Sequence, residues 1–339
     1  MTSAGLSMSD GPRDLRTSMT TTRHRTSTTG MNFVPTRRLE DDSVLAMRAV
    51  PEELDASVVA QIDGRLAGVE IDHGVRVAWA IESGSRAWGF PSPDSDYDCR
   101  FIYVRPREDY LALWPHRDVI ETPLDKVLDV NGWDLAKTVR LLVKGNAVAI
   151  EWLRSPIVYT GGFSFRDGLL ALADDVVERA SIGRHYLHVA RRQQEGSATL
   201  KRFFYVLRTA SALRWLHDHP DEVVPPMDLP TLLAQSDVGD AIRRSTDDLI
   251  AAKARTREMG SGSPPPELVD FVDAELERAA HFETDRALKS ADDVQAAAEA
   301  YFRRTIETTD AGTGVGSPVS SVVRTAHGLL DDRRFVPPQ

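Results

Sequence analysis

The chain has 339 residues, 42% of them hydrophobic, and its 6 Trp and 11 Phe add to an apolar content sufficient for two ordinary domains with packed cores. Its formal net charge of -10 excludes a protein that coats long nucleic acid through a generally basic surface. The sequence contains no apolar run of the roughly 18 residues that a membrane-spanning helix needs, and no apolar signal segment at its start. We therefore expect a cytoplasmic protein without a membrane partner.

The single cysteine, Cys99, restricts the chemistry further. It excludes an intramolecular disulfide and a zinc site built from several cysteines, and it agrees with a reducing compartment. We expect it to be a small buried residue of a strand.

The first 40 residues are predicted to form a disordered arm. Residues 1–40 are rich in Ser, Thr, Gly and Arg and have almost no large apolar side chains, so burial cannot repay the entropy of ordering them. Three methionines in this stretch, Met8, Met19 and Met31, leave open a later translation start, and an arginine-rich arm for nucleic acid is the functional alternative. The tail, residues 309–339, is predicted to be flexible.

Residues 41–160 are predicted to form an α/β domain. Short stretches rich in β-branched and aromatic residues, bounded by turn residues, are typical of strands. They cover 75–83, 97–106, 117–123 and 125–133, and the hairpin 117–133 is expected to lie along the strand 97–106. A helical period follows, with Asp134 placed to cap its start and Gly145 its end.

After residues 155–159 the pattern becomes almost wholly helical. Apolar residues recur at i, i+3 and i+4 over 165–179, 181–195, 199–218, 237–259, 266–280 and 291–308. The α/β domain is therefore expected to be followed by a helical domain, residues 161–308.

The stretch ESGSRAWGFPSPDSDYDCR, residues 82–100, joins two predicted strands and carries the candidate chemistry. Gly84 after a strand lets the backbone approach a phosphate closely, and Ser85 beside it offers a hydroxyl and an N–H to the same anion. Asp96 and Asp98 are two residues apart on a strand, which sends both carboxylates to one face and Tyr97 into the core. Such a pair can hold one or two hard cations such as Mg²⁺.

A third carboxylate is expected from an adjacent strand. Asp129 fits, because Leu128 and Val130 on either side of it would face the opposite side of the sheet. Asp134 competes for this role, but its position before a helical run favours an N-cap.

These residues, in this order, resemble the signature of the DNA polymerase β-type nucleotidyltransferase superfamily: a Gly-Ser, then Ser/Thr-Asp-x-Asp on the next strand, then a later strand aspartate. Here they are Gly84-Ser85, Ser95-Asp96-Tyr97-Asp98 and Asp129. The surrounding sequence is similar to a bacterial and phage branch of predicted nucleotidyltransferases, some of them associated with RNA ligases in RNA-repair gene clusters. The segments that carry this similarity are GSRAWGFPSPDSDYD, FIYVRP, NGWDLAK and EWLRSPIVY. The resemblance spans residues 75–235, and the ordered set is far more specific than a lone Asp-x-Asp.

The resemblance implies a fold and a reaction. The fold is a mixed sheet flanked by helices and followed by a mostly helical domain, so that 41–160 would be the catalytic domain. A nucleoside triphosphate would be held by Gly84, Ser85, Ser95 and two Mg²⁺ ions, for which Mn²⁺ can substitute. The aspartates at 96, 98 and 129 would bind the metals, and an acceptor hydroxyl would attack the α-phosphorus and expel pyrophosphate.

Other candidate contacts to the nucleotide are cationic or aromatic. Arg86 could fork onto a phosphate, with a solvated loop arginine as the alternative. Lys201, Tyr205 and Arg208 share one helix face, which could point at the triphosphate or base, with an ordinary exposed face as the alternative. Trp88 could stack on a base, or it could pin its loop to the core.

The acceptor is not written in the motif. Residues 184–214 carry seven Lys and Arg against one acid, which favours a polyanionic acceptor, most plausibly an RNA end, with a protein or a small-molecule hydroxyl as alternatives. Two other readings remain open. One is a non-catalytic nucleotide- or RNA-binding or regulatory module. The other is a metal-dependent hydrolase or a sugar-nucleotide transferase, which the preceding Gly-Ser disfavours.

Overall fold

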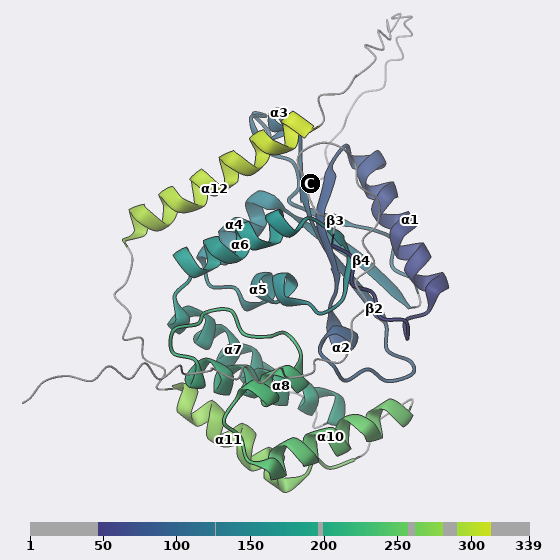
Figure 1. Ribbon diagram of the computed structural model, residues 1–339, viewed down its shortest axis with the longest axis vertical. Helices are drawn as coiled ribbons and strands as arrows, with labels where there is room; N and C mark the ends of the chain where they lie inside the picture. Colours follow the sequence, from purple (N-terminus) through teal and green to yellow (C-terminus); the bar gives the residue numbers. More distant parts are fainter. Residues whose placement is uncertain (1–46, 126, 196–198, 257–261, 281–289, 313–339) are drawn as a thin grey trace, which may run out of the picture. The chain divides into compact units, whose positions relative to one another are not determined.

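A computed structural model describes residues 47–125, 127–195, 199–256, 262–280 and 290–312. The predicted N-terminal arm and the predicted tail from residue 313 onward lie outside the described residues. Residues 309–312, which belong to the predicted flexible tail, are instead helical. Figure 1 shows a sheet with helices on both of its faces and a group of helices beyond it. The first elements are α1 (Ala56–His73), β1 (Arg76–Glu82), α2 (Gly84–Ala87), β2 (Tyr97–Val104), α3 (Arg107–Tyr110), β3 (Val119–Glu121), β4 (Leu128–Asp134), α4 (Leu135–Val143), α5 (Ala147–Arg154) and β5 (Val158–Gly161).

The rest of the described chain is helical. It contains α6 (Phe163–Val176), α7 (Arg179–Gln194), α8 (Leu200–Asp218), α9 (Leu229–Gln235), α10 (Asp240–Arg255), α11 (Pro266–Ala280) and α12 (Ala291–Gly312). No described helix is both long enough and apolar enough to cross a membrane.

The strands form one mixed sheet in the order β3-β4-β2-β1-β5. β1 is antiparallel to β2 and β5, and β3 is antiparallel to β4, whereas β2 and β4 run parallel. The hairpin of β3 and β4 thus lies along β2, as the strand pattern predicts. The predicted α/β fold with a mixed sheet flanked by helices is confirmed.

Residue alternation along the strands decides what each face of the sheet carries. Tyr97, Cys99, Phe101 and Tyr103 of β2 are buried in the cluster that α1 covers. Because successive side chains of a strand point to opposite faces, the even-numbered residues of β2 face away from α1. Tyr97 therefore lies in the core and Cys99 is buried, as expected.

The local caps explain where helices begin. Asp134 accepts a hydrogen bond from the Ala136 N–H and starts α4, which confirms the N-cap interpretation. α4 ends at Val143 with Lys144 as its C-cap, and Gly145, the predicted cap, follows one residue later in the left-handed conformation with φ of 67°. The strand and helix patterns did not indicate α1, although Asp55 caps it and Val59, Ile62 and Leu66 form its buried stripe at helical spacing.

The helices of the predicted helical region form two groups that pack against different parts of the protein. α8 packs against α7, α9 and α11, whereas α6 and α12 contact each other and α4, so they lie against the α/β part. On the latter side, the rings of Tyr110 and Phe302 meet edge to face at 5.0 Å, and the Arg76 guanidinium donates to the Thr309 hydroxyl at 2.9 Å. The last described helix thus returns to the sheet domain.

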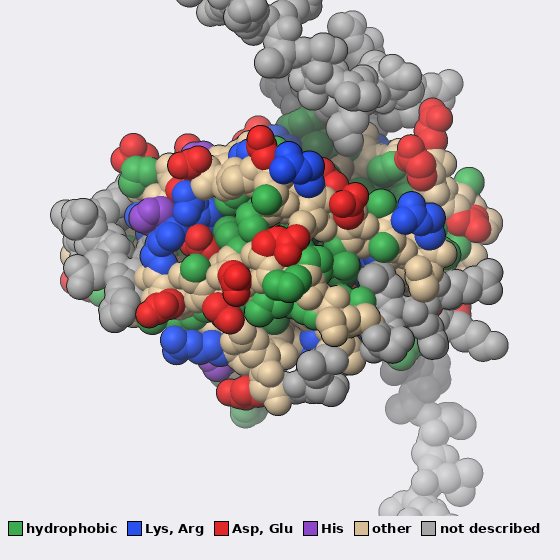
Figure 2. Space-filling view, turned by 90° about the horizontal axis from the view of Figure 1, so that it is seen from below, with side chains coloured by type: hydrophobic (Ala, Val, Ile, Leu, Met, Phe, Trp, Pro, Cys, Tyr) green, Lys and Arg blue, Asp and Glu red, His purple; other side chains and the backbone are tan. Residues whose placement is uncertain are grey.

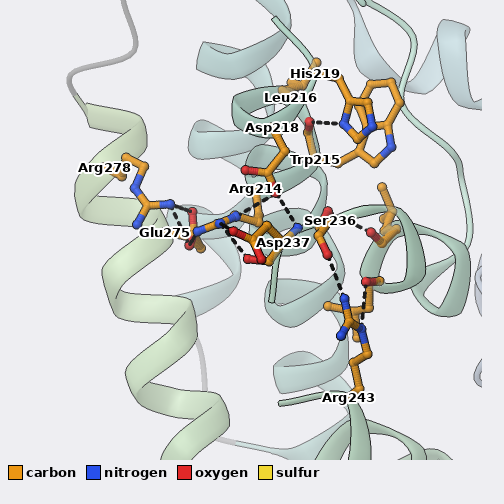
Figure 3. Close-up of polar contacts among 12 residues, drawn as sticks. Arg214, Trp215, Leu216, Asp218, His219, Ser236, Asp237, Arg243, Glu275 and Arg278 are labelled. Atoms are coloured by element: carbon orange, nitrogen blue, oxygen red, sulfur yellow. Dashed lines mark hydrogen bonds and ion pairs between the residues drawn. The ribbon is translucent and has the colours of Figure 1, made fainter. Parts of the chain in front are cut away.

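A charged network joins the helices at the other end (Figure 3). Arg214 of α8 bonds to Asp218 at 2.9 Å and to the backbone oxygen of Asp237 at 2.6 Å. It also pairs at 3.4 Å with Glu275 of α11, a carboxylate that is 3% exposed and that Arg278 holds from the other side. On the face of the molecule in Figure 2, acidic and basic side chains are interspersed among apolar ones.

Candidate active site

The candidate site lies where β1 ends and where β2 and β4 begin. β1 is followed directly by Ser83 and by the short helix α2, which starts at Gly84. In the parallel pairing of β2 and β4, Asp98 lies opposite Asp129. Two carboxylates that are far apart in the chain therefore meet on neighbouring strands, beside the Gly84-Ser85 turn.

Position 84 requires a glycine because of its contact with Asp98. Its φ is 61°, a left-handed conformation that side chains disfavour. A Cβ at this position would collide with the Asp98 carboxylate. The Ser83 N–H also donates to the Asp98 carbonyl oxygen at 2.8 Å, so the turn and the start of β2 are locked together. The predicted closeness of the glycine to the aspartates is thus present in the structure.

The serines and Arg86 tie the following loop to α2. The Ser85 hydroxyl donates to the Ser95 hydroxyl at 2.8 Å, and the Ser92 N–H donates to the same oxygen at 2.9 Å. Arg86 donates to the backbone oxygens of Ser95 at 2.6 Å and Asp96 at 3.1 Å. These three predicted nucleotide-binding residues, Ser85, Arg86 and Ser95, therefore lie together and shape the loop that carries the aspartates.

Arg100 occupies the space between the two paired aspartates. Its Nη2 bonds to Asp98 Oδ1 at 2.9 Å and to Asp129 Oδ2 at 2.8 Å, and its Nη1 bonds to the backbone oxygens of Cys99 and Asp129 at 3.0 Å each. The sequence reasoning missed Arg100. A signal was available, because residue 100 shares a strand face with residue 98.

The three aspartates differ in environment. Asp98 and Asp129 are half-buried and share the Arg100 guanidinium, whereas Asp96 is exposed and no described residue pairs with its carboxylate. Burial is the main cause that raises the pKa of Asp98; Arg100 opposes it, and the charges of Asp129 and Asp96 add to it. All three carboxylates therefore act in one electrostatic field, and that field attracts a cation.

Glu82 is a second residue that the sequence reasoning did not single out. It is fully buried at the end of β1, where its carboxylate accepts hydrogen bonds from the Asp98 N–H at 2.9 Å and from the Tyr159 hydroxyl at 2.6 Å. Burial raises the pKa of Glu82 to about 7, against the opposing effect of these hydrogen bonds. The residue supports the backbone of Asp98 from behind.

The donor set suits a hard metal ion in kind. Among the described residues, no three His, Cys, Asp or Glu side chains are already gathered as a metal site. The carboxylates at 96, 98 and 129 nevertheless supply the oxygen ligands that Mg²⁺ prefers, and two of them already share one cation, the Arg100 guanidinium. A metal ion here would share these two carboxylates with that arginine or compete with it for them.

The residues of α8 that are predicted to share one nucleotide-facing side lie in different environments. Tyr205 packs edge to face on Trp88 at 5.2 Å, and its pKa is raised by burial and by the charges of Asp98 and Asp96, so its hydroxyl lies in the field of the site. Arg208 is 5% exposed, bonds to Glu151 at 2.7 Å and covers the Trp88 ring at 4.4 Å. In this structure Arg208 is thus held between α8 and the α/β part, by Glu151 of α5 and the ring of Trp88.

The loop after α2 is packed against the core by its aromatic residues. This agrees with the interpretation of Trp88 as a residue that holds its loop to the core. Phe90 is fully buried and stacks on Phe204 of α8 at 4.8 Å. The Leu229 N–H, at the start of α9, donates to the Trp88 carbonyl oxygen at 3.0 Å. The helical part therefore holds the loop that connects the Gly-Ser turn to the aspartates.

The basic segment of residues 184–214 is not one continuous patch. Arg184, Arg191 and Arg192 of α7 are exposed. Arg208 and Arg214, in contrast, are used in ion pairs within the protein. The exposed cations that remain for a polyanion lie mainly on α7.

Comparisons with known proteins agree with this geometry. A family model described as "RlaP: RNA repair pathway DNA polymerase beta family" matches residues 58–304. Over 223 residues the chain is also 38% identical to an uncharacterized protein, YcgL, of Bacillus subtilis (strain 168). That alignment covers 64% of this chain and 85% of the Bacillus protein.

Substitution of two left-handed glycines separates backbone strain from the contact with Asp98. Gly74, with φ of 60°, has open space where a Cβ would stand, whereas at Gly84 the Cβ would meet the Asp98 carboxylate. We expect Gly74→Ala to lower the free energy of unfolding by about 1 kcal/mol, and Gly84→Ala to lower it by roughly 2 kcal/mol or more, because of the added overlap. Urea denaturation measures both. Equal losses would show that the contact with Asp98 carries no energy.

Glu82 is expected to make stability depend on pH. Its pKa is raised to about 7 in the folded state from 4.5, so the folded chain keeps a proton that the unfolded chain releases, and stability falls as pH rises from 4.5 to 7. The loss amounts to about 3 kcal/mol. Chemical denaturation at several pH values should show this decline in the wild type and in the exposed control Glu277→Gln, and a flatter profile in Glu82→Gln. Parallel profiles for all three proteins would contradict the assignment.

Proposed function

Because the chain belongs to the RlaP family, the RNA repair pathway DNA polymerase beta family, we propose that it transfers a nucleoside monophosphate from a nucleoside triphosphate to a hydroxyl acceptor at an RNA end and releases pyrophosphate. The family is one of polymerase β-type nucleotidyltransferases of RNA repair. One observation carries the proposal: the parallel register of β2 and β4 brings Asp98 and Asp129 together beside the Gly84-Ser85 turn.

Each part of the site has a proposed role. Asp96, Asp98 and Asp129 would hold Mg²⁺, two ions in the full site, with Mn²⁺ as a substitute. When bound, the metal supplies charge neutralisation at the phosphates and an activated acceptor hydroxyl. The Gly84-Ser85 turn, against which the missing side chain at position 84 lets the Asp98 carboxylate lie, would present its backbone to a phosphate.

Positioning would account for most of the rate in a reaction of this kind. Glu82 and the Ser83 N–H fix the backbone of Asp98, and the bonds of Ser85 and Arg86 to residue 95 and its neighbours fix the loop before it. Tyr205 lies in the field of the aspartates from the side of α8, and it would contact a bound nucleotide there.

One observation favours a second candidate, a non-catalytic nucleotide- or RNA-binding module. Arg100 already supplies a positive charge to two of the carboxylates. Transfer to a protein acceptor is a further variant of the leading proposal, since the geometry of the aspartates is indifferent to the acceptor.

Transfer of label tests the leading proposal. The wild type, incubated with each α-labelled nucleoside triphosphate, Mg²⁺ or Mn²⁺, and RNA, DNA or protein acceptors, is expected to label RNA and release pyrophosphate. Asp98→Asn should reduce the rate on the order of 100-fold or more, whereas Asp248→Asn, an exposed aspartate of α10, should not change it. Nucleotide and RNA binding without any transfer would favour the binding module, and label on protein would change the acceptor.

Arg100 is expected to compete with metal. It lies within 3 Å of two carboxylates, so its removal leaves them uncompensated and should tighten binding of Mn²⁺ by roughly tenfold, or about 1.4 kcal/mol. Titration followed by electron paramagnetic resonance, without nucleotide, compares the wild type with Arg100→Gln. The exposed arginine variant Arg117→Gln serves as the control. Weaker binding in Arg100→Gln would mean that the arginine organises the metal site rather than competing with the ion.

A further inference from the structure

A buried lysine without an acidic partner lies beside the loop that follows the Gly-Ser turn. Lys253 of α10 is 6% exposed, and its Nζ stands 4.6 Å from the centre of the Phe90 ring and 5.0 Å from that of Phe204. Within the described part of the chain it makes no hydrogen bond or ion pair. Burial of an unpaired ammonium is costly, and contact with aromatic faces returns only part of that cost.

The end of the Lys253 side chain is not wholly enclosed in the way that other buried polar groups are. Among the described residues, the wholly enclosed and unpaired polar side-chain atoms belong to Trp88, Arg208 and Thr246. Lys253 is 6% exposed, and a lysine can bury its stem while its ammonium lies at the surface.

A second lysine adds to the same positive field. Lys201, exposed at the start of α8, repels the charge of Lys253. Burial first, and then Lys201, lowers the pKa of Lys253 to about 8, and Asp94 of the loop opposes this more weakly. The charges of Lys201 and Lys253 outnumber that of Asp94, so positive charge is in excess around Lys253 at neutral pH. An anion with more than one negative charge would relieve it.

This charged pair adjoins the candidate active site. Phe90, on which Lys253 rests, belongs to the loop between the Gly84-Ser85 turn and the aspartates. On α8, Lys201 is one helical turn from Tyr205, which lies in the field of Asp96 and Asp98. The two lysines therefore stand on the helical side of the same loop.

We propose that Lys253, together with Lys201, forms a binding subsite for the terminal phosphates of a nucleoside triphosphate. The inference rests on the proposed nucleotidyl transfer and adds to it a residue of α10. A compact, multiply charged phosphate tail fits two adjacent ammonium groups beside an aromatic wall, because lysine binds phosphate as a point charge. An extended RNA strand fits less well, since Lys253 offers only the end of its side chain.

Equilibrium binding tests the subsite without turnover. The probes are the four α,β-methylene nucleoside triphosphates, inorganic tripolyphosphate and the matching nucleoside monophosphates, each with Mg²⁺. Lys253→Met keeps an unbranched apolar stem against the rings and removes the charge. It should weaken binding of the triphosphates and of tripolyphosphate by about tenfold or more, and should leave the affinity for monophosphates unchanged. Lys253→Arg should retain most of the affinity, and Lys144→Met, an exposed lysine at the end of α4, should match the wild type.

Thermal unfolding of the same variants separates a binding role from a structural one. Because Lys253→Met removes a buried charge, its unfolding midpoint should equal or exceed that of the wild type, even as triphosphate binding is lost. A lower midpoint with unchanged affinity would assign the lysine to the fold and overturn the subsite.

The remaining outcomes distinguish the inference from the function on which it rests. If the wild type binds triphosphates and Lys253→Met binds them equally well, the subsite is wrong and nucleotidyl transfer stands. If Lys253→Met loses affinity only for a short RNA oligonucleotide, the lysine serves the acceptor and the subsite is again wrong. If the wild type binds no triphosphate at all, the proposed function itself fails, and the subsite with it.

Discussion

The site depends on one constraint, the close approach of the Asp98 carboxylate to Gly84 while the same side chain faces Asp129 across a parallel strand pair. The first contact needs a residue without a side chain in the left-handed conformation. The second needs the register in which residue 98 of β2 lies opposite residue 129 of β4. A slip of one residue would turn the carboxylates to the face that α1 covers, where the neighbours are apolar.

Several features of the surrounding structure hold this register. Glu82 and the Ser83 N–H fix the backbone of Asp98 on one side, and Arg100 joins the two carboxylates on the other. Arg100 also compensates charges that would otherwise repel each other in a partly buried place. The Arg100 guanidinium stabilises the two carboxylates, and a metal ion would bind the same carboxylates. The stabilisation of the site by Arg100 and metal binding therefore oppose each other.

The helical part contributes to the site through the loop rather than through the sheet. Phe90 and Trp88 are clamped by α8 and α9, and Lys253 of α10 rests on the ring of Phe90. Arg208 and Glu151 form an ion pair of which both members are nearly buried, and the guanidinium covers Trp88. The loop that links the Gly-Ser turn to the aspartates is thus shaped by helices that follow it by more than a hundred residues in the chain.

Local patterns in the sequence predicted four of the five strands, most of the helices, the Gly-Ser and Asp-x-Asp elements, the cap at Asp134 and the alternation around Asp129, because each depends on residues two to four positions apart. The strand β5 was not among them. It also indicated the family, which the match over residues 58–304 shows. Tertiary contacts were needed to show that Arg100 bridges the aspartates, that Glu82 is buried behind them, that Arg208 of α8 pairs with Glu151 of α5 and that Lys253 lies beside the loop. Each of these depends on contacts between elements distant in the chain, and spacing along the sequence carries no record of which elements meet.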